Sequence, residues 1–287
     1  MSRNQRLRRL IGREEILIAP GVYDAYLARC VERAGFEAIY MTGAGVSHSR
    51  LGVPDLGLLS FSEMLEQAGR IADAVDLPLI ADADTGYGNP MNVARTIRAY
   101  ERAGVSACHI EDQQMPKRCG HFDEKRVVSL AEMLAKLKAA LDARTDPDFV
   151  IIARTDARTV EGLEAALERA NAYAQTGADM IFVESPLSED ELALIGRTVK
   201  APLLANMVES GKTPILPAEK LEALGFSVVI HPGSIGRFIG KQVGAFLQQF
   251  RRERSTLSQI DRMLTFAEQN EIVDLQDYLD RAKRYLA

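Results

Sequence analysis

Short apolar runs alternate with longer amphipathic stretches along most of the chain. The apolar runs are three to six residues long and rich in aliphatic side chains, which is typical of buried strands. They predict strands at residues 16–19, 38–41, 77–81, 105–110, 149–153, 180–183, 202–205 and 228–230. The amphipathic stretches between them predict helices at residues 23–34, 62–74, 91–103, 130–143, 161–176, 189–199 and 218–224.

Eight strands that alternate with helices are typical of a parallel (β/α)8 barrel, the TIM-barrel fold. The alternative, an open doubly wound sheet, is disfavoured because no Gly-x-Gly-x-x-Gly turn follows the first strand. No linker or low-complexity tract interrupts the chain, so residues 1–287 are expected to form one domain. A barrel needs one helix after its eighth strand, whereas the residues after Gly236 predict two or three. The surplus, at about 240–287, is therefore expected to pack on another subunit.

Composition and charge narrow the class of protein. The net charge of −5 and the isoelectric point near 5.6 argue against a nucleic-acid surface, which is normally basic. Three cysteines, Cys30, Cys108 and Cys119, form no disulfide framework and fit a reducing compartment. The basic N-terminus lacks the apolar segment of a secretion signal, and no apolar run approaches the roughly 18–20 residues that cross a bilayer. We therefore expect a soluble cytoplasmic protein that binds neither nucleic acid nor membrane.

The strongest sign of chemistry is the segment that follows the fourth predicted strand. This strand ends in two acids and leads into a loop with the sequence QQMPKRCGH. In it Cys119 stands beside Lys117, Arg118 and His121, whose positive charge would favour the thiolate. An ordinary buried cysteine rarely has such neighbours, so we expect a reactive thiol here. Cys30 lies on an apolar helix face and Cys108 inside a predicted strand, so both are expected in the core.

Acidic residues also mark the strand ends, where the active sites of such barrels lie. Asp82 and Asp84 are two residues apart in an extended segment, so their side chains point to one side. With Glu111 they could provide hard oxygen ligands for Mg²⁺, with Mn²⁺ as a substitute. Alternatively, these acids cap helices or pair with Arg154.

Arg154, at the end of the fifth strand, has two interpretations. It could bind a substrate carboxylate through both of its guanidinium donors. It could equally form a structural ion pair with Glu184 or Asp156.

The second strand ends in a turn that could bind an oxyanion. Thr42, Gly43 and Gly45 could donate hydroxyl and amide hydrogen bonds, although a plain turn would have the same composition. His48 and His109 have no evident partner in the sequence, and we interpret them as structural.

Several motifs together resemble the isocitrate lyase/phosphoenolpyruvate mutase superfamily over nearly the whole chain. They are KRCGH at residues 117–121, DADTGYG at 82–88, HIEDQ at 109–113, RTDA at 154–157, FVE at 182–184 and ANM at 205–207. The first motif is specific to the carbon–carbon lyase branch of this superfamily, because mutase and decarboxylase members lack its cysteine.

The resemblance implies a Mg²⁺-dependent barrel in a homotetramer, a dimer of dimers whose last barrel helix is exchanged between subunits. It implies that Asp82 and Asp84 hold the metal, that Glu111 joins through water, and that residues 117–121 form a mobile loop over the site. It also implies a set of residues for the carboxylate substrate: Thr42, Gly43, Ala44, Gly120, Arg154, Glu184, Asn206 and Arg237.

The reaction implied by the resemblance is cleavage of a 2-hydroxy acid between C2 and C3. Cys119 would protonate the departing carbanion, and such general acid help is typically about 10²–10⁴ in rate. Lys117 and Arg118 could stabilise the carbanion by charge, and His121 belongs to the same catalytic loop. The base that takes the hydroxyl proton is Tyr40 or Glu111.

Substrate choice depends on whether a third carboxylate can be bound. Methylisocitrate lyases carry a Thr-Arg pair for it near the C-terminus, whereas the matching place here reads TFAE at residues 265–268. Phe266 would suit an alkyl group better than a carboxylate. The segments MP at 115–116, FVESP at 182–186 and ESGKT at 209–213 also look closer to 2,3-dimethylmalate lyase and the petal death protein.

We therefore expect cleavage of a 2-alkylmalate dicarboxylate to pyruvate and a short carboxylate. A tricarboxylate methylisocitrate lyase is the first alternative, followed by an oxaloacetate hydrolase. A catalytically silent barrel is disfavoured because Asp84 and Cys119 are both present, and Cys119 also argues against a phosphonomutase.

Overall fold

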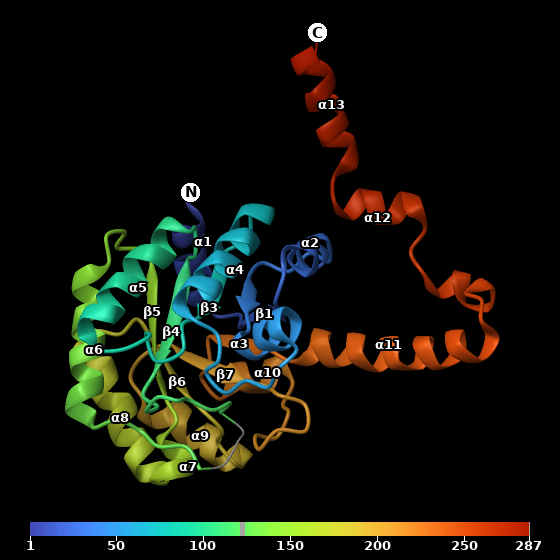
Figure 1. Cartoon of the computed structure of the whole chain (residues 1–287). Coiled ribbons are helices and arrows are strands. Elements are labelled where there is room, and N and C mark those ends of the chain that lie inside the picture. Colours follow the sequence, from blue (N-terminus) through green and yellow to red (C-terminus); the bar gives the residue numbers. More distant parts are fainter. Residues whose placement is uncertain (121–123, 287) are drawn as a thin grey trace.

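The computed structural model describes residues 1–120 and 124–286. Its parallel strands form one closed barrel in which neighbours along the chain pair and β1 pairs with β8 (Figure 1). Every strand begins within two residues of its predicted start, and the (β/α)8 prediction is confirmed. The strands are β1 (Leu17–Val22), β2 (Ile39–Met41), β3 (Leu79–Asp82), β4 (Ala107–Glu111), β5 (Val150–Thr155), β6 (Met180–Val183), β7 (Leu203–Asn206) and β8 (Val228–His231).

The predicted helices surround this barrel, and their ends lie within two residues of the predicted ones. They are α2 (Ala25–Arg33), α4 (Phe61–Ala74), α5 (Pro90–Arg102), α6 (Leu130–Ala143), α8 (Leu163–Thr176), α9 (Glu189–Thr198) and α10 (Ala218–Ala223). Polar caps start several of them, as in the capping box of Ser60 and Glu63 before α4. Three short helical segments were not predicted: α3 (Gly43–Val46), η1 (Ser47–Leu51) and α7 (Ala157–Val160).

Each strand is buried on both faces, which is why its sequence is a continuous apolar run. Side chains such as Tyr40, Ile152 and Phe182 fill the inside of the barrel. Their neighbours, such as Ile39 and Ile151, face outward into the layer between strands and helices. Burial of a large aliphatic side chain contributes roughly 1.5–3 kcal/mol, so this double layer holds the strand ends in fixed positions.

One further helix, α1 (Arg3–Ile11), was not predicted from the sequence. Its Leu7 and Leu10 are fully buried together with the residues that fill the barrel. Arg8 donates hydrogen bonds to the carbonyl groups of Pro147 and Phe149, in the loop that enters β5. The helix therefore closes the end of the barrel at which the strands begin.

The C-terminal tail leaves the barrel. It consists of α11 (Ser234–Glu253), η2 (Leu257–Arg262), α12 (Phe266–Ile272) and α13 (Leu275–Leu286), so the expected extra helices are present. No side chain of α11 is buried, and Figure 1 shows this helix extending away from the strands. No helix of the described residues is long and apolar enough to cross a bilayer.

Candidate active site

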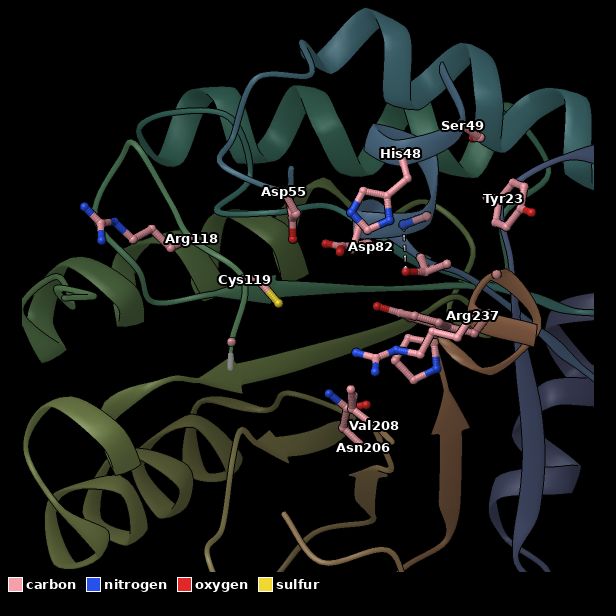
Figure 2. Close-up of a pocket in the computed structure, with 18 of the residues that line it drawn as sticks. Tyr23, His48, Ser49, Asp55, Asp82, Arg118, Cys119, Asn206, Val208 and Arg237 are labelled. Atoms are coloured by element: carbon pink, nitrogen blue, oxygen red, sulfur yellow. Dashed lines mark hydrogen bonds between the residues drawn. The ribbon is translucent and has the colours of Figure 1, made fainter. Parts of the chain in front are cut away.

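A cavity of about 490 Å³ opens at the ends of the strands (Figure 2). Most of the predicted site residues line it, although they come from loops and strands far apart in the sequence. The predicted residues in its wall are Tyr40, Thr42, Ala44, Asp82, Lys117, Arg118, Cys119, Gly120, Arg154, Glu184, Asn206 and Arg237. Gly43, Asp84 and Glu111 lie outside the wall. His121 falls outside the described residues.

Lys117 is buried between two carboxylates. Its Nζ lies 2.6 Å from Oδ1 of Asp55 and 2.7 Å from Oδ1 of Asp84. The backbone of the same loop is also attached here, since the amide of Cys119 donates to the carbonyl of Asp55 at 3.2 Å. The loop after β4 is therefore folded inward over the strand ends. Asp55 was not predicted, because an isolated acid in a loop carries no local sign of a partner 62 residues away.

The acids of β3 and β4 are adjacent, as expected. The amide of Asp84 donates to Oδ1 of Asp82 at 2.9 Å, and the amide of Glu111 donates to the carbonyl of Asp84 at 2.9 Å. Gly43 has no room for a side chain, because a Cβ there would lie 2.5 Å from Oδ2 of Asp82. Its amide donates to that oxygen at 3.2 Å, so α3 begins directly against the acid.

These acids fit a hydrated Mg²⁺ better than a site built from protein ligands alone. Within residues 1–120 and 124–286, no three Asp, Glu, His or Cys side chains are arranged to ligate an ion together. Mg²⁺, however, is usually bound through one or two carboxylates and keeps several waters. Oε1 of Glu111 is buried without a hydrogen bond, and Oδ1 of Asp84 has only the ion-pair contact with Lys117. Burial raises the pKa of Asp84 to about 6, which a bound cation would reverse.

Arg154 is the centre of a buried ion cluster. Its Nε and Nη2 bond the two oxygens of Asp156 at 2.9 and 3.2 Å. Nη1 lies 3.1 Å from Oε2 of Glu111, and Nη2 lies 3.6 Å from Oε2 of Glu184. The predicted ion pairs with Asp156 and Glu184 are therefore both present. The guanidinium still lines the cavity, so the two interpretations of Arg154 are compatible.

Cys119 and its neighbour Arg118 point in different directions. Figure 2 shows the sulfur of Cys119 directed into the cavity, whereas the side chain of Arg118 extends away from it. Arg118 pairs with Glu124 at 2.8 Å and is 41% exposed. The amide of Gln113 holds the backbone at Arg118 through two hydrogen bonds of 2.8 and 2.9 Å. Of the predicted cationic neighbours in the described loop, Lys117 is the one held inside the site.

Tyr40 and His109 form a buried pair beneath Asp82. The hydroxyl of Tyr40 and Nε2 of His109 are 2.8 Å apart, and Nε2 lies 3.7 Å from Oδ1 of Asp82. Burial lowers the pKa of His109 to about 4 and raises that of Tyr40 well above its usual value, so both are neutral at pH 7. His109 therefore has partners that its sequence context did not reveal. His48 also lines the cavity, beside Ser49.

The opposite side of the cavity is more apolar. Val208, Pro232 and Ile239 line it together with Arg237, whose Nη1 donates to the carbonyl of Glu209 at 2.6 Å. Figure 2 shows Arg237 reaching towards the space into which Cys119 points. Phe266, in contrast, lies on α12 and is 84% exposed, outside the wall of this cavity. Phe266 therefore does not reach the cavity of its own chain, and its role in substrate choice stays a prediction that depends on the expected packing of the tail on another subunit.

Comparison with known proteins assigns this arrangement to a family. The family described as phosphoenolpyruvate phosphomutase matches residues 7–251. The 2,3-dimethylmalate lyase of Eubacterium barkeri is 46% identical over 276 residues, which cover 96% of each chain. The chain belongs to the phosphoenolpyruvate mutase/isocitrate lyase superfamily.

Other members of the superfamily are similarly close. The 2-methylisocitrate lyase of Shewanella oneidensis is 44% identical over 274 residues, covering 96% of this chain and 92% of that protein. A structure of oxaloacetate acetylhydrolase with 3,3-difluorooxalacetate has a TM-score of 0.94 and 37% identity, covering 99% of this chain and 97% of the other. A structure of 2,3-dimethylmalate lyase has a TM-score of 0.94 and 35% identity, with coverages of 99% and 96%. The protein is a lyase of this superfamily.

Proposed function

We propose that this lyase cleaves a 2-hydroxy dicarboxylate of the 2,3-dimethylmalate or 2-alkylmalate type to pyruvate and a short carboxylate, with Mg²⁺ as cofactor. The observation that carries the proposal is the cavity itself, in which the thiol of Cys119 faces a wall that is ionic on one side and apolar on the other. The high identity to a 2,3-dimethylmalate lyase over nearly the full length supports the same substrate class.

The ionic side would bind the half of the substrate that becomes pyruvate. Arg154 can donate to its carboxylate while Asp156 keeps the guanidinium in place. Bound at Asp82 and Asp84, with Glu111 nearby, Mg²⁺ would supply Lewis-acid stabilisation of the negative charge that develops on the substrate's C2 oxygen. The first turn of α3 borders the same region at Ala44, so the backbone amide of Ala44 is the expected donor to that half, while the amide of Gly43 already donates to Asp82.

Cys119 is the proposed general acid. The hydroxyl at C2 loses its proton, the C2–C3 bond breaks, and its electron pair moves to C3 and onto the adjacent carboxylate as an enolate. The thiol then gives its proton to C3, which completes the short carboxylate and leaves a thiolate. Lys117, held inside the site by Asp55 and Asp84, adds positive charge near the developing enolate.

Burial and position favour one of the two candidates for the base that takes the hydroxyl proton. Glu111 does not line the cavity, whereas Tyr40 does. Because burial raises the pKa of Tyr40 well above its usual value, a free phenolate is disfavoured at neutral pH. Tyr40 therefore fits a neutral group that passes or shares a proton with the substrate, and a bound cation would lower the cost of its deprotonation.

The apolar side of the cavity favours an alkyl substituent over a third carboxylate. Val208, Pro232 and Ile239 offer no cation, and Arg237 is the cation next to them. A single arginine there suits the second carboxylate of a malate. A tricarboxylate would place one charged group against apolar side chains, which is costly without a partner.

A substrate panel tests the proposal. In the presence of Mg²⁺, the release of pyruvate from 2,3-dimethylmalate and from 2-methylisocitrate would be measured. The release of oxalate from oxaloacetate would be measured in parallel, because an oxaloacetate acetylhydrolase has the same fold. We expect dimethylmalate to be preferred, Cys119→Ser to lose about 10²–10⁴ in rate, and Cys30→Ser, on the outer helix α2, to keep it. Preference for methylisocitrate or oxaloacetate would overturn the substrate class, and full activity of Cys119→Ser would overturn its role as the acid.

We also propose a homotetramer, a dimer of dimers in which α11 covers the barrel of a neighbouring subunit. The support is the tail, whose large apolar side chains, including Phe238, Leu247 and Leu257, are at least half exposed in a single chain. Light scattering during size-exclusion chromatography should give a mass near four times 31.6 kDa. A monomeric mass would contradict this assembly.

A further inference from the structure

Gly120, the residue after Cys119, is seated unusually tightly against the active site. A Cβ at this position would lie 2.6 Å from Cγ and Cδ of Glu184 and 2.7 Å from Nη2 of Arg154. Its backbone is not in the left-handed region, so glycine is needed here for space and not for conformation. The loop therefore contacts the substrate-binding arginine directly through its backbone.

The carbonyl of Gly120 has two side-chain donors on the barrel side. Nζ of Lys125 donates to it, and Oγ of Ser185 lies 3.1 Å away. The side chain of Lys125 is 1% exposed, and its other partner is Oδ1 of Asp156 at 2.7 Å. A buried ammonium group is costly unless its partners are in place, so the Gly120 carbonyl completes the coordination of Lys125.

Ser185 is held in a conformation that serves this contact. Its φ is +57°, in the left-handed region that non-glycine residues rarely adopt. This turn directs its hydroxyl to a position between the Gly120 carbonyl and Oε1 of Glu184, which is 2.8 Å away. Strained backbone of this kind is concentrated at functional sites, and here it brings a donor to the loop.

We propose that Lys125 and Ser185 are positioning residues that seat the Gly120 carbonyl and thereby hold the Cys119 thiol over the cavity. The inference rests on the proposed role of Cys119 as the general acid. Neither residue lines the cavity, so both act through Gly120 and not on the substrate.

The same contacts link the position of the Gly120 carbonyl to substrate binding. Oδ1 of Asp156 accepts from both Lys125 and Nη2 of Arg154, at 2.7 and 3.2 Å. When a substrate carboxylate draws Nη2 of Arg154 towards itself, Oδ1 of Asp156 accepts from Lys125 alone. Binding at Arg154 therefore strengthens the ion pair that orients Lys125 towards Gly120, and the thiol is held in place when substrate is present.

The test measures how readily Cys119 is reached by a thiol reagent. Folded enzyme would be alkylated with iodoacetamide without substrate, and the rate at Cys119 determined by peptide mass spectrometry relative to Cys30. Loss of the ammonium donor in Lys125→Met should raise the Cys119 rate about ten-fold or more, and Ser185→Gly about three-fold, since a net hydrogen bond corresponds to a factor of this order. The matched control is Ser210→Gly, which relieves the same backbone conformation, at φ +60°, on an exposed residue.

With any of the three substrates that is turned over, kcat/KM should fall more in Lys125→Met than in Ser185→Gly. The unfolding temperature of Ser185→Gly should stay close to that of wild type. Alkylation rates of Ser185→Gly and Lys125→Met within the range of Ser210→Gly would overturn the proposal. If Lys125→Met does not fold, Ser185→Gly decides alone. Absence of turnover by the wild-type enzyme refutes the proposed function, whereas the alkylation rates still test whether Lys125 and Ser185 position the Gly120 carbonyl.

Discussion

Adding one methyl group at Gly120 should separate catalysis from folding. In Gly120→Ala the new Cβ would meet Glu184 and Arg154 at 2.6–2.7 Å, closer than carbon atoms approach one another, so the loop has to withdraw. Withdrawal loses the charge-assisted hydrogen bond from Lys125 and the shared one from Ser185. Together these contribute about 2–4 kcal/mol. Because 1.36 kcal/mol corresponds to a factor of ten in rate, kcat/KM should fall about 30-fold to 10³-fold.

Two other glycines provide the controls for this variant. Gly196→Ala places a Cβ 1.8 Å from the carbonyl oxygen of Leu224, between α9 and the end of α10, and should lower the unfolding temperature. Gly69→Ala, in α4, meets no atom closer than 3.8 Å and should raise it slightly, because alanine favours the helix. Gly120→Ala should lose activity while its unfolding temperature falls less than that of Gly196→Ala, because only the hydrogen bonds of one loop are lost. Activity within about three-fold of wild type, or a loss of stability like that of Gly196→Ala, would refute the reasoning.

Two further predictions concern charge. Mg²⁺ at 100 times its Kd should stabilise the folded protein by about 2.7 kcal/mol, which is measured as a rise of several degrees in the unfolding temperature. The variant Asp84→Asn should abolish this rise. The control variant Asp73→Asn, at an exposed position on α4, should keep it. An equal rise in both variants would contradict the metal site. For Asp156, burial raises the pKa, but Arg154 and Lys125 outweigh this and lower it to about 2, below the value of about 3.9 in an unfolded chain. Its ionised form thus stabilises the protein above about pH 4, and this stabilisation is lost towards pH 2. Denaturant unfolding should therefore show that the difference in free energy of unfolding between wild type and Asp156→Asn decreases from pH 4 to pH 2. A difference that stays constant over this range would contradict the prediction.

The barrel could be predicted because its strands are buried on both faces. Each strand is then a continuous apolar run, and polar residues begin where the strand leaves the core, so the strand ends also revealed Asp82, Glu111 and Arg154. Helix α1 escaped notice because Leu7 and Leu10 are its only buried residues among arginines. Its location follows from the open end of the barrel, which is a property of the whole fold.

The residues that contact the loop around Cys119 were also missed. Asp55 and Lys125 are single charged residues in loops, and their roles depend on Asp84 and Asp156, far away in the sequence. Ser185 resembles an ordinary loop serine until its φ is known. The position of Phe266 could not be predicted for the same reason, because a motif aligned with a substrate-binding position does not show which cavity the side chain reaches.

Helix α1 also has a consequence for the order in which the chain folds during synthesis. Asn4 bonds Asp146 and Arg8 bonds Asp179, so α1 leaves the ribosome 142 and 171 residues before these partners. At translation rates of about 5–20 residues per second, α1 waits roughly 10–30 s for the loops that receive it. During that time Leu7 and Leu10 have no barrel to enter, so the apolar face of this helix is buried only after the loops before β5 and β6 have been made.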